Sequence, residues 1–172
     1  MCPYVPYVFK KYVFQVFKFN QVLYICYSPN FQMMKHVTKK SLNHLCYQII
    51  GAAIEVHKLL GPGLVEQVYE TCLEHELLRR NLKVTRQKSV PIQYKGLSLE
   101  ANLRYDLLVE DCVVIELKAV EILHPIFEAQ IMTYMRLLEK PKGIILNFNC
   151  TNLYREGQKT FVNEFYRMLP EE

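Results

Sequence analysis

One stretch of the sequence sets the architecture: Leu103-Arg-Tyr-Asp-Leu-Leu-Val-Glu-Asp-Cys-Val-Val-Ile-Glu-Leu-Lys118. The runs 103–109 and 113–117 are dense in leucine, valine, isoleucine and tyrosine, and a polar Glu110-Asp111 pair separates them. This pattern predicts two β-strands joined by a tight turn. Four charged side chains interrupt the apolar runs: Arg104, Asp106, Glu116 and Lys118. Because burial of a charge is costly unless the charge is paired or holds a metal, their positions require an explanation.

The register of this hairpin determines which charged side chains meet. Side chains two residues apart lie on the same face of a strand, so Glu116 and Lys118 point the same way. If Val109 pairs with Val113 across a three-residue loop, Asp106 stands opposite Glu116. A two-residue loop would mix polar and apolar side chains on both faces. We therefore expect the three-residue loop, which gathers the two carboxylates and the lysine on one face.

Two carboxylates that meet across a hairpin repel each other unless a cation lies between them. Mg²⁺ or Mn²⁺ is the usual cation for a site built from oxygen ligands. The neighbouring Lys118 ammonium could orient or deprotonate a water molecule, or stabilise charge that develops on a phosphate. A surface hairpin with weak cross-strand ion pairs, Arg104–Glu116 and Asp106–Lys118, is the alternative interpretation.

Length and charge limit the classes that remain. A chain of 172 residues predicts one domain with a single core. The net charge of +4 arises largely from residues 1–34, which carry three lysines and no acid. We expect residues 1–34 to be a poorly ordered extension outside a domain of residues 35–172, with a membrane-surface or partner-binding arm as the alternative. Overall basicity therefore gives no argument for nucleic-acid binding, and any binding surface must be local.

The chain shows no sign of a membrane or secreted protein. Lysines break every apolar run before it could span a bilayer, and no signal peptide precedes the domain, so we expect a cytoplasmic protein without membrane contact. The six cysteines form no CxxC pair, which favours reduced thiols over a zinc site or a disulfide framework.

Apolar periodicity predicts most of the remaining elements. One helix is expected from an N-cap at Ser41 to Gly61-Pro62-Gly63, and a second follows from Leu64 to about Arg80, with Glu66 and Glu70 on its solvated face. Proline at the first turn indicates a third helix from Pro125 to about Glu139. The other expected elements are strands over 83–94, 97–108 and 143–147, and a closing amphipathic helix over 159–169.

Two motifs resemble a known family. Asp106, followed after nine residues by Glu116-Leu117-Lys118, resembles the D-x(n)-(D/E)-x-K signature of the PD-(D/E)xK nuclease superfamily, although Tyr105 stands where that signature has proline. Gly63-Leu-Val-Glu66-Gln-Val-Tyr69 resembles the GxxExxY proteins, a family within that superfamily. The likeness covers about residues 38–168 and runs through Gln87 to Asn147-Phe148-Asn149.

This resemblance implies an α/β fold with a restriction-endonuclease-like core. The implied order is a helix, a three-stranded meander, a helix and a strand. An extra N-terminal helix precedes that core, and the closing C-terminal helix completes it. The spacing Gln130-Ile-Met-Thr-Tyr134 on the third helix is similar to the motif that follows the ExK strand in exonuclease branches of the superfamily.

The resemblance also implies a function, which is metal-dependent hydrolysis of phosphodiester bonds in nucleic acid. Asp106, Glu116 and the Leu117 carbonyl would hold Mg²⁺ or Mn²⁺, and Glu66 could complete the site. Lys118 would activate the attacking water, and Gln130 would orient Lys118 or contact a phosphate. Tyr134 and Tyr69 would support these groups, and the candidates for phosphate contacts are Arg104, Lys88 and Lys95.

The expected partner is nucleic acid, DNA in preference to RNA, and a homodimer is left open. Two other functions remain. A catalytically silent nuclease-like fold could serve as a module for protein or nucleic-acid interaction. A nickase or repair-type enzyme could act only within an assembly and look inactive alone.

Overall fold

The computed structural model describes residues 16–19, 22–25, 37–99 and 103–172. The chain divides into two units, Met1–His36 and Val37–Glu172. In the first unit, strands β1 (Val16–Phe19) and β2 (Val22–Ile25) pair antiparallel. Most of the extension predicted for residues 1–34 lies outside the described residues, and the domain boundary after residue 34 stays a prediction.

The second unit opens with two helices, α1 (Lys39–Leu60) and α2 (Glu66–Arg79). The predicted N-cap at Ser41 is wrong, because Thr38 caps α1 instead. The Thr38 side chain accepts a hydrogen bond from the Ser41 backbone N–H, and the Ser41 side chain accepts one from the Thr38 backbone N–H. This reciprocal capping box needs a polar residue at both positions, which explains why Ser41 resembled a cap. Gly61 ends α1 with a φ of 67°, a left-handed value that glycine adopts without strain.

The C-terminal residues close the start of α1. The backbone N–H groups of Lys39 and Lys40 donate to the carbonyls of Pro170 and Glu171, at 2.8 and 3.2 Å. Ion pairs from Lys39 to Glu171 and from Lys40 to Glu172 lie over these bonds. N–H groups in the first turn of a helix have no partner within the helix, so the tail satisfies two of them.

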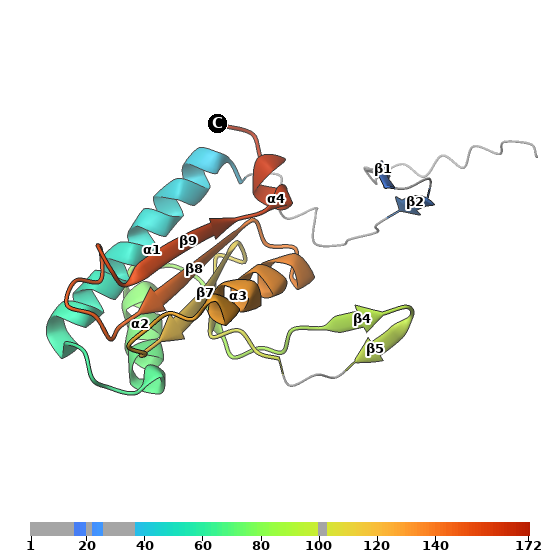
Figure 1. Cartoon of the computed structure of the whole chain (residues 1–172). Helices are drawn as coiled ribbons and strands as arrows, with labels where there is room; N and C mark the ends of the chain where they lie inside the picture. The colour runs from blue at the N-terminus through green and yellow to red at the C-terminus, as the bar shows by residue number, and fades with distance from the viewer. Residues whose placement is uncertain (1–15, 20–21, 26–36, 100–102) are drawn as a thin grey trace, which may run out of the picture. The chain divides into compact units, whose positions relative to one another are not determined.

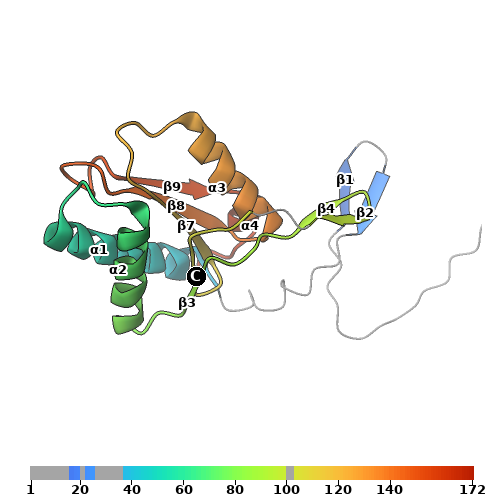
Figure 2. The same cartoon turned by 90° about the horizontal axis from the view of Figure 1, so that it is seen from below.

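A mixed five-stranded sheet forms the centre of this unit, in the order β3-β6-β7-β8-β9. Strands β7 and β8 are parallel and the other neighbours are antiparallel. Helix α3 (Pro125–Leu137) connects the two parallel strands and covers one face of the sheet, while α1 and α2 cover the other (Figures 1 and 2). The strands span Val84–Arg86, Leu107–Val109, Val113–Lys118, Lys142–Asn147 and Gln158–Val162. This arrangement confirms the predicted α/β fold class.

The hairpin of β6 and β7 has the predicted register. Val109 pairs with Val113 and Leu107 pairs with Ile115, so the loop between the strands has three residues. Val114 belongs to an apolar cluster with α3 residues such as Ile131 and Met135. Since side chains alternate along a strand, the residues of β7 that share a face with Val114 point toward α3. Those residues are Glu116 and Lys118.

Two long strands that the sequence predicted are interrupted. Residues 83–94 divide into β3, which joins the sheet, and β4 (Ile92–Tyr94), which does not. Residues 97–108 divide likewise into β5 (Leu97–Leu99) and β6, and β4 pairs only with β5. The break begins at Gln87, whose φ of 51° ends β3, and Pro91 has no N–H to donate to a neighbouring strand.

The closing segment is also different from its prediction. Instead of one amphipathic helix over 159–169, it forms the edge strand β9 and the short helix α4 (Glu164–Arg167). Strand β9 pairs with β8, and the Asn163 side chain caps α4 by accepting hydrogen bonds from Phe165 and Tyr166. No described helix is long and apolar enough to cross a membrane. The four described cysteines are free thiols: Cys46, Cys72, Cys112 and Cys150.

Candidate functional site

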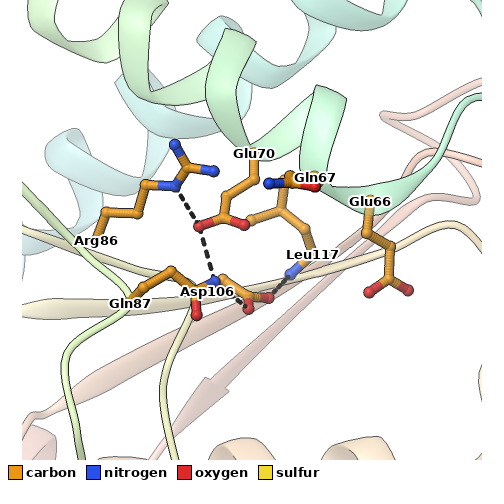
Figure 3. Close-up of a pocket in the computed structure, with 7 residues that line it drawn as sticks. All are labelled: Glu66, Gln67, Glu70, Arg86, Gln87, Asp106 and Leu117. Carbon is orange, nitrogen blue, oxygen red and sulfur yellow. Dashed lines mark hydrogen bonds and ion pairs between the residues drawn. The ribbon is translucent and has the colours of Figure 1, made fainter.

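A pocket of roughly 430 Å³ opens where α2 faces the start of β6 and the end of β7 (Figure 3). Its lining residues come from α2, from the end of β3 and from the central hairpin: Glu66, Gln67, Glu70, Arg86, Gln87, Asp106 and Leu117. Glu116 and Lys118 lie on the α3 side of β7 and do not line this pocket. Asp106 therefore lines the open pocket and is also close enough to the buried Glu116–Lys118 pair for its charge to affect Glu116.

The Asp106 carboxylate is held directly before β6 by two donors. Its Oδ2 accepts a hydrogen bond from the Leu117 backbone N–H at 2.8 Å, and its Oδ1 lies 3.3 Å from Nε2 of Gln87. Burial raises the pKa of Asp106, whereas the Leu117 N–H and the positive charge of Lys118 act in the opposite direction. The site thus fixes this carboxylate against β7 while it partly desolvates the charge.

Glu70, Arg86 and Gln87 form a network beside Asp106. The Glu70 Oε1 accepts from Arg86 Nε at 2.6 Å and from Gln87 Nε2 at 2.8 Å, as Figure 3 shows. The backbone N–H of Gln87 donates to the Asp106 carbonyl at 3.0 Å. The prediction that Glu70 lies on a solvated face is wrong, because this residue is only 6% exposed and its carboxylate is bound by Arg86 of β3 and by Gln87, which follows β3.

Sequence reasoning gave Arg86 and Gln87 no role, although Gln87 lies within the resemblance. The sequence did contain a signal for Arg86. Glu70 and Glu74 lie one helical turn apart in α2, and a basic residue in the strand that follows the helix can form ion pairs with both. Arg86 also contacts Glu74, one turn beyond Glu70, at 3.4 Å. Glu70 raises the pKa of Arg86 through their hydrogen bond, so this guanidinium stays charged.

Glu116 is the most deeply buried acid of the site, at 2% exposure. Its Oε2 lies 3.3 Å from Nζ of Lys118, whereas its Oε1 is buried and has no hydrogen-bond partner among the described residues. The pKa of Glu116 is raised to about 8; burial is the largest cause, the negative charge of Asp106 adds to it, and the positive charge of Lys118 offsets part of the effect. A buried carboxyl oxygen without a partner is costly, and a cation would remove that cost.

Lys118 is buried beside Glu116 and makes a second polar contact. Its Nζ donates to the Leu117 carbonyl at 2.9 Å and lies 5.3 Å from the centre of the Phe127 ring. The ammonium thus contacts both Glu116 Oε2 and the Leu117 carbonyl, two atoms that the sequence proposed as metal ligands. The sequence predicted that Phe127 lies in the first turn of α3, but it did not predict that the Phe127 ring points toward Lys118.

Glu66 reaches the end of β7 from the first turn of α2. Its Oε1 accepts a hydrogen bond at 3.2 Å from the backbone N–H of Ala119, the residue after Lys118. Figure 3 shows Glu66 on the side of Leu117 away from Glu70. The structure therefore brings Glu66 to the same strand end as the ExK residues.

Tyr69 holds the loop that precedes Glu66. Its hydroxyl donates to the Gly61 carbonyl at 2.7 Å and accepts from the Leu64 N–H at 3.1 Å. Its ring stacks on Phe148, with 4.4 Å between the ring centres. In the GxxExxY stretch, the tyrosine thus fixes the turn between α1 and α2, and the glutamate one helical turn earlier reaches β7.

Gln130 and Tyr134 contact each other on α3. Nε2 of Gln130 donates to the Tyr134 hydroxyl at 2.9 Å, and no hydrogen bond joins Gln130 to Lys118 among the described residues. Burial raises the pKa of Tyr134, and the negative charges of Glu116 and Asp106 raise it further. Tyr134 therefore lies close to the carboxylates of Glu116 and Asp106, and Gln130 contacts the Tyr134 hydroxyl.

The donor set suits a hard divalent cation. Asp106, Glu116 and the Leu117 carbonyl supply oxygen ligands, and the unpartnered Glu116 Oε1 is available to a cation. Within the described ranges, no three acidic, histidine or cysteine side chains are already close enough together to hold a metal ion. The carboxylate and carbonyl oxygens of Asp106, Glu116 and Leu117 are nevertheless donors of the chemical type that Mg²⁺ and Mn²⁺ accept.

Comparison with known proteins agrees with this geometry. A family model of the PD-(D/E)XK nuclease superfamily matches residues 43–161, a range that includes Asp106, Glu116 and Lys118. No curated protein and no solved structure matches the chain. Nucleases of this superfamily generally use divalent metal ions, and their substrates are nucleic acids. By its fold, its hairpin and the match over more than half of its length, the chain belongs to the PD-(D/E)XK nuclease superfamily.

Proposed function

We propose that this protein is a nuclease that hydrolyses phosphodiester bonds of nucleic acid, DNA in preference to RNA, with the help of Mg²⁺ or Mn²⁺. The observation that carries the proposal is the buried Glu116, which lies beside Asp106 and Lys118 with one carboxyl oxygen unpartnered. The likeness of residues 63–69 to the GxxExxY proteins supports a place within that family. A cytoplasmic location and a homodimer remain proposals from the sequence.

The cation would be held by Asp106, Glu116 and the Leu117 carbonyl, with Glu66 as a further ligand from α2. When bound, Mg²⁺ or Mn²⁺ lowers the pKa of a water molecule and neutralises charge on the phosphate. The chain prepares these ligands in two ways. The Leu117 N–H and the Gln87 amide fix the Asp106 carboxylate, and the turn held by Tyr69 directs Glu66 toward the end of β7.

Lys118 is the proposed catalytic residue that positions and activates the attacking water. Its ammonium lies between Glu116 and the Leu117 carbonyl, so it is adjacent to every proposed ligand on β7. From this position it would orient the attacking water and stabilise negative charge on the phosphate. The Phe127 ring packs near the ammonium and limits its access to bulk water.

A second function is favoured by one feature of the same site. Because the Lys118 ammonium already satisfies Glu116 Oε2 and the Leu117 carbonyl, the charges of β7 can be compensated without a metal. That arrangement suits a nuclease-like fold that serves as an interaction module. The two functions differ in what Mg²⁺ does, since only the nuclease must bind it.

The test is a cleavage assay with Mg²⁺ and Mn²⁺ on single-stranded, duplex and branched DNA and on RNA. Lys118→Ala should abolish metal-dependent cleavage, and Glu116→Gln should lower it by at least about 100-fold because it removes a ligand. Lys159→Ala is the matched control, because Lys159 forms an exposed ion pair with Glu128 on the surface. Equal cleavage by the parent and Lys118→Ala would refute the assignment. Absence of both cleavage and metal binding in calorimetry would favour the interaction module.

A further inference from the structure

The hairpin of β4 and β5 extends away from the five-stranded sheet and its helices (Figure 1). We call these strands, with their turn at Lys95-Gly96, the arm. Among its strand residues, Ile92 is half-buried and the others are exposed. A two-stranded hairpin has marginal stability in water by itself, so the exposed strand residues of this arm are candidates for contact with a partner.

The two faces of the arm differ in chemistry. Ile92 pairs with Leu99 and Tyr94 pairs with Leu97, so these four side chains share one face. Tyr94 is 59% exposed and Leu97 is 57% exposed. The opposite face carries the remaining pair, Gln93 and Ser98, which are hydrogen-bonded at 3.0 Å. The arm therefore has an open apolar face and a polar face.

Positive charge gathers on the arm and at its base. Before residue 37 the chain has four lysines and no acid, so the 17 basic and 17 acidic residues that follow cancel. Within this neutral unit, residues 82–105 hold five basic residues and one acid, Glu100, which lies outside the described residues. Lys88, Lys95 and Arg104 are exposed and form no ion pair within the described residues. The arm thus has one exposed cation, Lys95, at its turn and two more, Lys88 and Arg104, at its base.

The base of the arm is part of the candidate site. Ser89 bridges Arg104 between the two connecting segments, and the Val90 N–H donates to the Leu103 carbonyl at 2.8 Å. Val90 is buried in the core next to α3, so the base is anchored. Gln87 and Asp106, which end these segments, both line the pocket. The two segments at the base of the arm therefore lead directly into residues that line the pocket.

We propose that the arm docks double-stranded DNA and holds it beside the candidate site, an inference that rests on the proposed nuclease function. A two-stranded ribbon fits the major groove of B-DNA, which is about 12 Å wide. Lys88, Lys95 and Arg104 then contact phosphates on the flanking backbones. The apolar face reaches base edges, where thymine methyl groups offer apolar contacts.

Other occupants fit the arm less well. Duplex RNA has a deep, narrow major groove that side chains cannot read. A second copy of the chain would require roughly 20–30 residues a side for a stable interface, and the apolar face of the arm offers four side chains. The unpaired cations at the base and tip favour a polyanion over either a second copy or an apolar partner.

The first experiment measures binding of the full chain to a short labelled DNA duplex by fluorescence anisotropy, with divalent cations chelated so that no cleavage occurs. The variant Lys88→Gln/Lys95→Gln/Arg104→Gln should bind about tenfold more weakly or worse, and its slope of log affinity against log salt should flatten by about 3. The control Arg136→Gln/Arg155→Gln/Arg167→Gln removes three exposed charges outside the arm. It should retain the parent affinity and slope.

The second experiment tests the apolar face. Tyr94→Thr/Leu97→Thr keeps side chains that favour strands, so it should weaken duplex binding several-fold without changing the salt slope. The control Tyr47→Thr/Leu59→Thr replaces an exposed tyrosine and leucine of α1 and should bind like the parent. Thermal melting checks that each variant is folded, and the arm variants should melt with the parent because the arm lies outside the core.

Three outcomes would overturn the inference. The first is that the arm variants bind DNA like their controls, and the second is that the parent binds duplex RNA as tightly as duplex DNA. The third is that ultracentrifugation reveals a dimer of the parent that Tyr94→Thr/Leu97→Thr abolishes. In each case, metal-dependent cleavage of single strands by the parent would leave the proposed nuclease function standing. If the parent neither binds nor cleaves any nucleic acid, the proposed function fails, and this inference fails with it.

Discussion

At the scale of single residues, the environment of Glu116 is unfavourable for the stability of the fold. Glu116 is buried, next to a second carboxylate, and one of its oxygens has no partner among the described residues. A folded protein retains such a group only at a cost. The sequence predicted that Glu116 and Asp106 meet, but it could not give the depth of burial.

The raised pKa of Glu116 predicts how stability depends on pH. With a pKa of about 8 in the folded state and 4.5 as its ordinary value, this carboxyl binds a proton more tightly when folded. Its contribution to stability is present below pH 4.5 and is lost as the pH rises through 8. In metal-free buffer, Glu116→Gln should therefore gain stability over the parent as the pH rises from 5 to 8, by several degrees in Tm.

Thermal melts at a series of pH values check this prediction. Glu121→Gln is the control, because Glu121 is exposed, and its Tm should track that of the parent at every pH. A Tm difference between Glu116→Gln and the parent that stays constant from pH 5 to pH 8 would contradict the assigned pKa.

The residues that sequence reasoning missed share one physical reason. Glu70, Arg86 and Gln87 come from different elements, and their contacts depend on how α2 lies over the end of β3. Helical periodicity placed Glu70 on a polar face, which is correct for the helix alone. The Glu70 carboxylate can be buried because its ion pair with Arg86, a residue of another element, offsets the cost of desolvation.

At the scale of elements, the central hairpin was predictable because one register separates polar from apolar side chains. The parallel strand β8 was predictable as well, since an unbroken apolar run indicates a strand buried on both faces. The arm and β9 were not, because their ends depend on the left-handed backbone at Gln87 and on pairing with β8. Local sequence patterns contain neither feature.

The packing of α3 on β8 depends on a single glycine. A Cβ at Gly143 would lie 2.7 Å from Sδ of Met135 and 2.9 Å from Cδ1 of Ile131. Both side chains are fully buried, so Gly143→Ala should destabilise the fold by about 1–3 kcal/mol as α3 shifts. Urea denaturation measures this loss.

A matched glycine and a compensating change make that result specific. Gly51 lies within α1, where an added Cβ would meet Nη1 of Arg80 at 3.2 Å, the end of a long side chain that needs to shift only slightly, so Gly51→Ala should cost much less stability than Gly143→Ala. Adding Ile131→Val to Gly143→Ala should recover part of the loss. Equal stability of Gly143→Ala and the parent would show that α3 does not constrain β8.

At the scale of the whole molecule, Val37–Glu172 contains every element of the sheet and its helices. Its first helix is capped by Thr38 and by the C-terminal tail, both within the same unit. We therefore predict that a chain of residues 37–172 folds alone, with a Tm within about 2 °C of the full chain.

Differential scanning calorimetry of the two chains tests this independence. A second truncation that begins at Ser41 is the comparison, because it removes Thr38 and the two lysines that contact the tail. It should lose about 1 kcal/mol or more of stability. A fall of more than about 5 °C for residues 37–172 would mean that the first unit stabilises the second.

The bonds between Pro170, Glu171 and the first turn of α1 have a consequence for biosynthesis. Helix α1 is the first helix of this unit to be synthesised, but the hydrogen-bond acceptors for its first turn are Pro170 and Glu171, which are synthesised much later. While the polypeptide is still being elongated, that helix end and the edge of β8 that awaits β9 stay exposed. Packing of the unit therefore finishes only after residues 158–171 have emerged from the ribosome, and until then the edge of β8 is open to pairing with other strands.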